Sequence, residues 1–205
     1  DLHIGVVSSD VGAFAGVRGC EAQGDDGVLR SAPNPGREAA LKCEAAYPAF
    51  IDFAAAASEL DEVASDFGCI AALGTEGCGF EQHLESALKA LWPASRPELT
   101  FLGSGPAAAS GRGDRDNAGF LRGSASTLGV VVIADEDDCS TEERAIFRPD
   151  KLPDNPYQAQ PLNLRCHYNH AKSFALERYL FGLSNLGSRR VVFAALAGVP
   201  PAAVD

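Results

Sequence analysis

The sequence of 205 residues lacks methionine, has a single tryptophan and few basic residues. It also lacks the run of about 18 apolar residues that a membrane-spanning helix requires, so no such helix is predicted. Its 17 Lys and Arg stand against 28 Asp and Glu, which gives a net charge of −11. Nucleic-acid binding depends on clustered Lys and Arg. The expected partners are therefore cations or basic protein surfaces, not nucleic acid.

Several catalytic and metal-binding motifs are missing as well. The sequence has no CxxC pair and no GxSxG segment, which removes the usual support for zinc ribbons, thioredoxin chemistry and serine hydrolases. Its four histidines stand in no recognisable catalytic context. His167 and His170 have metal-like i, i+3 spacing but no third ligand nearby. We therefore expect a protein that is not an enzyme.

Length and composition are those of a globular chain. An apolar fraction of 46% is enough for a core, and the length fits a single domain over residues 1–205. The chain begins with Asp1 and has no methionine, so we expect a processed or excised segment. A signal peptide, a lipid anchor or a first strand could lie upstream of it.

Six cysteines form an even set in a chain that could fold without them. Secretion with disulfide bonds is the simplest explanation, and buried free thiols in a cytosolic protein are the alternative. About 15 pairings are possible for six cysteines. We predict sequential pairing, because each bridge would then close one loop beside an apolar element. The predicted bridges are Cys20–Cys43, Cys69–Cys78 and Cys139–Cys166.

Uninterrupted apolar runs alternate with segments of helical periodicity along the chain. Strands are expected at Leu2–Ser8, Val130–Ala134 and Val191–Ala197. Apolar residues recur at helical spacing within 60–74, 80–91 and 172–183. This alternation predicts an α/β fold: a doubly wound, mainly parallel sheet with helices on both faces, a Rossmann-like three-layer sandwich with disulfide-stapled loops.

Four acidic residues, Asp135 to Asp138, directly follow the central apolar run. In open α/β sheets ligands bind beyond the carboxyl ends of the strands, where this turn should emerge. Adjacent carboxylates repel one another unless they are solvated or share a cation. Oxygen ligands of this kind suit Mg²⁺, Ca²⁺ or Mn²⁺. The turn is a candidate metal site, and a solvated acidic turn is the alternative.

The pattern Asp135-x-Asp137 after an apolar strand also resembles the DxD turn of nucleotide-sugar glycosyltransferases, where Mn²⁺ neutralises the diphosphate leaving group. Such an enzyme needs basic residues and a nucleotide pocket near the N-terminus. The first strand leads here to Ser8-Ser9-Asp10, without a Gly-rich phosphate loop. A metal-dependent glycosyltransferase-like enzyme is the alternative function, and a purely structural surface domain is a third.

Five sequence blocks together carry a resemblance to a known family. They are IGVVSSD at 4–10, GTEGCGFEQ at 74–82, NAGFLR at 117–122, VIADEDDC at 132–139 and RVVFAA at 190–195. In this order they resemble a von Willebrand factor type A (vWA) domain, of the cysteine-rich variety found in bacterial, myxobacterial-type surface lipoproteins. The likeness covers nearly the whole chain. It implies an extracytoplasmic protein-binding or adhesion module in the periplasm, on the outer-membrane surface or secreted.

The resemblance also implies a divalent cation at the carboxyl edge of the sheet, bound by a DxSxS turn, a Thr and an Asp and completed by a partner protein. Asp135 matches the Asp, and Thr75 lies in the loop of the Thr. Asp137 and Glu81 are further candidate oxygen ligands. The DxSxS turn is absent, so the first strand and its ligands lie upstream of Asp1, or this chain lacks half of the site.

Overall fold

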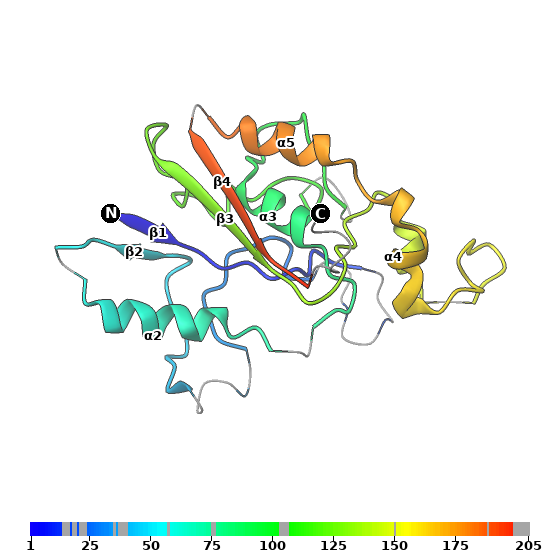
Figure 1. The fold of residues 1–205 in the computed structure, drawn as a ribbon, viewed down its shortest axis with the longest axis horizontal. Helices are drawn as coiled ribbons and strands as arrows, with labels where there is room; N and C mark the ends of the chain where they lie inside the picture. Colours follow the sequence, from blue (N-terminus) through cyan, green and yellow to red (C-terminus); the bar gives the residue numbers. More distant parts are fainter. Residues whose placement is uncertain are drawn as a thin grey trace.

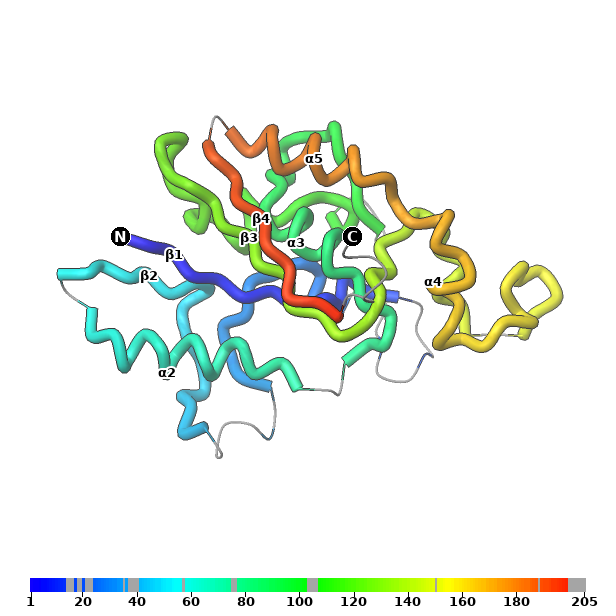
Figure 2. Tube along the Cα trace, viewed as in Figure 1, coloured from blue at the N-terminus to red at the C-terminus, as the bar shows by residue number. Residues whose placement is uncertain are grey.

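The strands of this protein form two separate pairs. The computed structural model describes residues 1–13, 17, 20, 24–34, 36, 41–56, 58–74, 77–102, 107–149, 151–187 and 189–198. In these ranges β1 (Leu2–Ile4) pairs antiparallel with β2 (Ile51–Phe53), and β3 (Thr127–Ile133) pairs in parallel with β4 (Arg190–Leu196) (Figure 1). Figure 2 shows β3 and β4 side by side along their length.

Helices account for most of the remaining regular structure in the described ranges. The α-helices are α2 (Leu60–Ala71), α3 (His83–Leu91), α4 (Arg165–Tyr168) and α5 (Leu176–Ser184). Short 3-10 helices lie at η1 (Arg144–Phe147), η2 (Leu162–Leu164) and η3 (His170–Lys172). Helix α3 ends where the sequence leads to a proline, because the residue before Pro93 is extended. None of the described helices is long and apolar enough to cross a membrane.

The prediction of a doubly wound sheet is wrong. The parallel pairing of β3 with β4 is present, but each described sheet has only two strands. Strand β1 stops at Ile4, and beyond it the carbonyl of Val6 accepts a hydrogen bond from the loop residue Arg30 (2.7 Å), not from a neighbouring strand. Helix α2 packs against β2. Apolar patterns predicted β1, β3 and β4 and the helices α2, α3 and α5, but not β2, and they do not say which edges pair.

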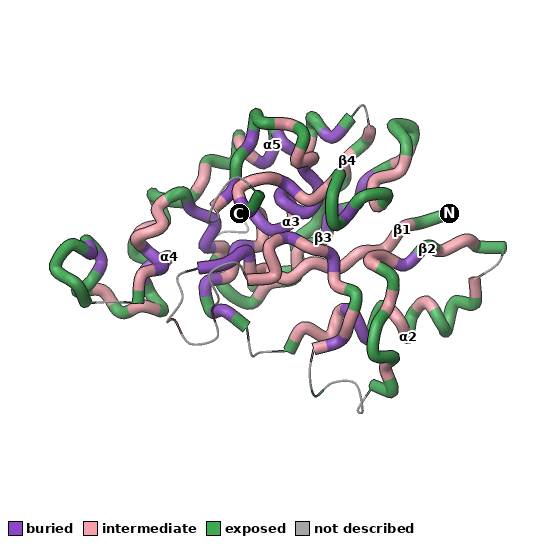
Figure 3. The backbone as a smooth tube through the Cα atoms, turned by 180° about the vertical axis from the view of Figure 1, so that it is seen from behind, coloured by how far each residue is buried: buried purple, intermediate pink, exposed green. Residues whose placement is uncertain are grey.

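The main core lies between α3, α5 and the inner face of β3. Leu88 and Trp92 of the α3 region pack with Leu128 and Val130 of β3 and with Tyr179 of α5. Trp92 is fully buried. Figure 3 shows the buried segments gathered around α3. A second cluster, which includes Phe80 and Phe147, surrounds two of the disulfides. The inner face of β3 therefore packs directly on helix α3.

A buried amide joins three segments at the end of α3. The side-chain oxygen of Asn117 accepts a hydrogen bond from the backbone N–H of Leu29, and its amino group donates to the carbonyls of Gly27 and Ala90, each at 2.9 Å. Asn117 is 1% exposed, so all three bonds are shielded from water. A buried amide that makes these bonds offsets its own desolvation and holds the segment 27–29 against α3.

The disulfides only partly follow the prediction. Cys139–Cys166 is confirmed, whereas Cys20 is bonded to Cys78 and Cys43 to Cys69. The predicted bridges Cys20–Cys43 and Cys69–Cys78 are therefore wrong. Short loop closure was the only guide from sequence, but the fold places Cys69 on the buried side of α2, where the segment that carries Cys43 meets it.

The position of Leu88 in the core gives a first prediction. Its side chain is 1% exposed, so Leu88→Ala should lower the free energy of unfolding by about 2–5 kcal/mol through lost burial and a cavity. The matched control is Leu180→Ala on α5, where the leucine is 66% exposed and the expected change is within about 0.5 kcal/mol. Chemical denaturation of both variants measures the difference. Equal losses would contradict this core.

Candidate functional site

The acidic turn lies where the sequence predicted it, at the carboxyl end of β3. Asp135, Glu136 and Asp137 are exposed, and Asp138 is half-buried. Strand β3 ends at Ile133, and Ala134 still donates its backbone N–H to the carbonyl of Leu196 (3.0 Å). The turn therefore starts at the end of the strand pair and presents three carboxylates to solvent.

The second half of the turn caps helix α3. The helix has no capping side chain of its own at Gln82. Instead, Asp138 Oδ1 accepts a hydrogen bond from the backbone N–H of Leu84, and Ser140 Oγ accepts one from Glu85, each at 3.1 Å. The first N–H groups of a helix need such partners, and a carboxylate there also interacts favourably with the helix dipole. Asp138 therefore has a structural role.

A histidine lies between two carboxylates beside this cap. His83 Nε2 is 2.8 Å from a carboxylate oxygen of Glu81, and its Nδ1 is 3.8 Å from Asp138 Oδ1. Burial raises the pKa of Glu81; His83 opposes this shift, and the nearby carboxylates of Glu136 and Asp135 add to it. The contacts of His83 with Glu81 and Asp138 were not predicted from the sequence. The start of the predicted helix 80–91 could have indicated these contacts, because it places His83 in the first helical turn, close to Glu81.

The predicted metal ligands do not converge in the described chain. Asp137 lies 3.3 Å from the ring of His167, and Glu81 is paired with His83. No group of three Asp, Glu, His or Cys side chains that could hold a metal ion exists among the described residues. Thr75 lies outside them. Among the described residues, the predicted ligands therefore form no metal site, and the cation at Asp135 stays a prediction.

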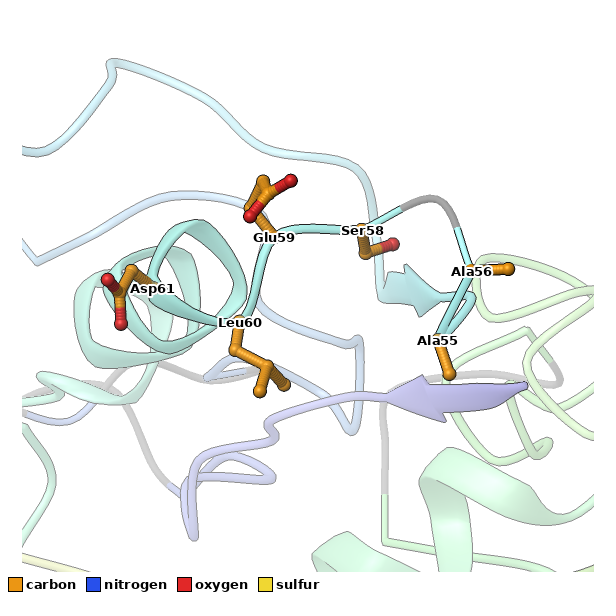
Figure 4. Close-up of a pocket in the computed structure, with 6 residues that line it drawn as sticks. All are labelled: Ala55, Ala56, Ser58, Glu59, Leu60 and Asp61. Atoms are coloured by element: carbon orange, nitrogen blue, oxygen red, sulfur yellow. The ribbon is translucent and has the colours of Figure 1, made fainter.

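The glycosyltransferase alternative requires a nucleotide pocket with basic side chains. A hollow of about 540 Å³ lies at the start of α2, between Ala55 and Asp61 (Figure 4). Its lining contains the carboxylates of Glu59 and Asp61 and no basic side chain. Because a diphosphate needs positive partners, this hollow does not favour the glycosyltransferase alternative.

A buried ion pair connects α3 with α5. Arg178 Nε and Nη2 donate to the two carboxylate oxygens of Glu85, at 2.7 and 3.1 Å. Burial raises the pKa of Glu85, and the arginine opposes that shift. Arg178 Nη2 also donates to the carbonyl of Thr100 at 2.6 Å. This bidentate pair orients α5 against the core. It accounts for a buried carboxylate at Glu85 through a structural role.

The outer side of the strand pair is apolar and exposed, whereas the predicted fold covers both faces of the sheet with helices. Leu128 and Val130 of β3 point to the core, so the alternate residues point outward. The register places Val192, Ala194 and Leu196 of β4 on the same side. We call this the outer apolar face; it consists of Val131, Ile133, Val192, Ala194 and Leu196. Their four large side chains are 51–71% exposed.

Comparison with family models, curated proteins and solved structures gives no match for this chain.

The partial burial of Glu81 predicts a pH dependence of stability. An acid whose pKa is raised in the folded protein releases its proton first in the unfolded chain. Stability contributed by protonated Glu81 is therefore present below its ordinary pKa near 4.5 and lost as pH rises through the raised value. Glu81→Gln stays neutral, so its free energy of unfolding should fall less between pH 4.5 and 7 than that of the wild type. Denaturation curves across this range measure the slope.

The control for this experiment is Glu177→Gln, which removes an exposed carboxylate on α5. It should leave the pH slope close to that of the wild type. If the stability of wild type and of Glu81→Gln changes with pH to the same extent, the pKa of Glu81 is not raised in the folded protein and the prediction is wrong.

The cap supplied by Ser140 gives a third prediction. Ser140→Ala removes the acceptor for the N–H of Glu85 and should cost about 1 kcal/mol of stability, within the range of about 0.5–2 for lost caps. Thermal unfolding measures the loss, and amide exchange at Glu85 locates it. Ser124→Ala, at an exposed turn, is the matched control and should change neither. A loss of protection elsewhere than at the start of α3 would contradict the cap.

Proposed function

We propose that this protein is an extracytoplasmic protein-binding module that binds its partner through the outer apolar face. Three disulfides support the compartment, because such bonds form and persist outside the reducing cytosol. The outer apolar face is the single observation on which the binding function rests. Parallel strands in proteins are normally covered on both faces. Here the described elements cover the inner face at Leu128 and Val130 of β3, whereas the outer face is uncovered and Phe193, on the inner side of β4, also remains 48% exposed.

The free energy that burial of the exposed apolar side chains would release favours a binding surface over a chance arrangement. Complete burial of one Val, Leu or Ile side chain stabilises by about 1.5–3 kcal/mol relative to full exposure. Val131, Ile133, Val192 and Leu196 are adjacent on one face and keep half or more of their area in water. Contiguous exposed apolar surface of this kind commonly marks an interaction site. A partner that covers these four side chains recovers a substantial part of that free energy.

This proposal keeps the adhesion function implied by the vWA resemblance but does not depend on the cation. The described side chains near Asp135 hold no set of metal ligands, so binding is assigned to apolar contact. The acidic turn at one end of the face then has an electrostatic role toward the partner.

A photo-crosslinking experiment tests the proposal. The amino acid p-benzoylphenylalanine replaces Val131 or Val192, and the protein is illuminated in the extracytoplasmic fraction of its source. We expect a discrete covalent adduct with one protein from both positions, because both lie on the outer apolar face. The additional substitution Ile133→Lys should reduce the yield at least about tenfold, since it buries a charge in the contact.

The matched control places the crosslinker at Leu152, which is 52% exposed in the segment between η1 and η2 and gives the background. EDTA should leave the adduct unchanged. A cation-dependent interaction would lose the adduct in EDTA, and equal labelling from Leu152 would rule out the outer apolar face as the binding surface.

A further inference from the structure

The outer apolar face has the dimensions of one α-helix. Its side chains span five positions of the strand pair, from Val192 to Leu196, which corresponds to about 16 Å at about 3.3 Å per residue. Two strands about 4.8 Å apart, with their side chains, form a strip roughly 10 Å wide. An α-helix is about 10 Å in diameter and rises about 1.5 Å per residue, so about 11 residues match the length of the strip.

The way in which parallel strands are covered also favours a helix. On the inner face, α3 and α5 supply the side chains that cover Leu128 and Val130. A partner strand added beside β4 would extend the sheet in its plane and leave Val131 and Ile133 in water. A helix laid along the strip contacts both strands at once, as helices do on parallel sheets.

Charge gives the helix a direction. The exposed carboxylates of Asp135, Glu136 and Asp137 lie at the carboxyl end of the strip, and Arg190 lies at its amino end. A helix has a positive N-terminal end and a negative C-terminal end. When it runs antiparallel to the strands, both of its ends meet opposite charge. Burial is the main cause of the raised pKa of Glu81, and the negative charges of Glu136 and Asp135 at this end add to it.

We propose that the partner presents an amphipathic helix of about three turns, antiparallel to β3 and β4, with basic residues in its first turns beside Asp135, Glu136 and Asp137. This inference rests on the proposed protein-binding function and names the chemistry of the partner. A second copy of this chain is a poorer occupant, because each copy has a net charge of −11 and like charges repel.

The test uses designed peptides of 16 residues with leucines at helical spacing. The first has lysines in its first two turns and glutamates in its last two, and the second has the same composition with these charges exchanged. A third peptide has alternating Val and Thr and forms an extended strand. Each is labelled with a fluorophore, and its binding to the protein is measured by fluorescence anisotropy at low and high salt.

The first peptide should bind at least about tenfold more tightly than the second and gain helical circular dichroism when bound. High salt should reduce this preference, because exposed charges are screened. Ile133→Lys should weaken binding at least about tenfold, whereas the matched variant Leu152→Lys on a distant exposed leucine should bind normally. Asp135→Asn combined with Glu136→Gln should remove the preference between the two charge patterns.

Other outcomes distinguish a failure of the helix inference from a failure of the proposed protein-binding function. If the strand peptide alone binds, or if sedimentation shows a dimer that Ile133→Lys dissociates, the helix inference is wrong while the face still binds protein. If the two helical peptides bind equally, the assigned direction is wrong. If no peptide binds and the crosslinker at Val131 gives no adduct, both the helix and the proposed function fail.

Discussion

The hydrogen bonds between the segment 138–140 and the start of α3 determine how the carboxyl end of β3 and its acidic turn are held. The carbonyl of Glu81 accepts from the N–H of Cys139, while Asp138 and Ser140 accept from the first turn of the helix. Because α3 is also the centre of the core, the end of β3 is held at a defined height above it. The bridge from Cys139 to Cys166 extends this attachment to α4.

Helix α3 can have this central position because its polar side chains are satisfied inside the protein. Glu85 is paired with Arg178 of α5, and the ammonium of Lys89 contacts Asp26 and donates to the carbonyl of Ala108 at 2.8 Å. Burial lowers the pKa of Lys89 to about 8. Buried charges are tolerated only with such partners, so the loop that carries Asp26 is bound to the helix by the need to neutralise Lys89. The polar network therefore specifies which loop covers α3.

The sequence predicted local structure better than long-range pairing. Helical spacing of apolar residues located α2 and α3, and the apolar runs located β3 and β4. The run at Val130–Ala134 also predicted burial on both faces, but Val131 is 62% exposed, since nothing in a run of valines states whether a second layer is present. Disulfide pairing and the β1–β2 contact depend on loop paths, which composition does not encode. In the site, Asp135 was placed at the end of the strand, whereas Asp138 serves α3, because capping requires knowledge of which helix start lies nearby.

Strand β4 has a consequence for how this protein behaves in solution. Its segment from Val191 to Leu196 contains no proline and no charge, and within the described chain it pairs along one side only, with β3. Such an edge can template the addition of identical strands, the first step toward amyloid-like aggregates. Mutual repulsion between these acidic molecules slows that encounter, so the excess of carboxylates also keeps the protein dispersed in solution. High salt screens this repulsion and therefore favours aggregation.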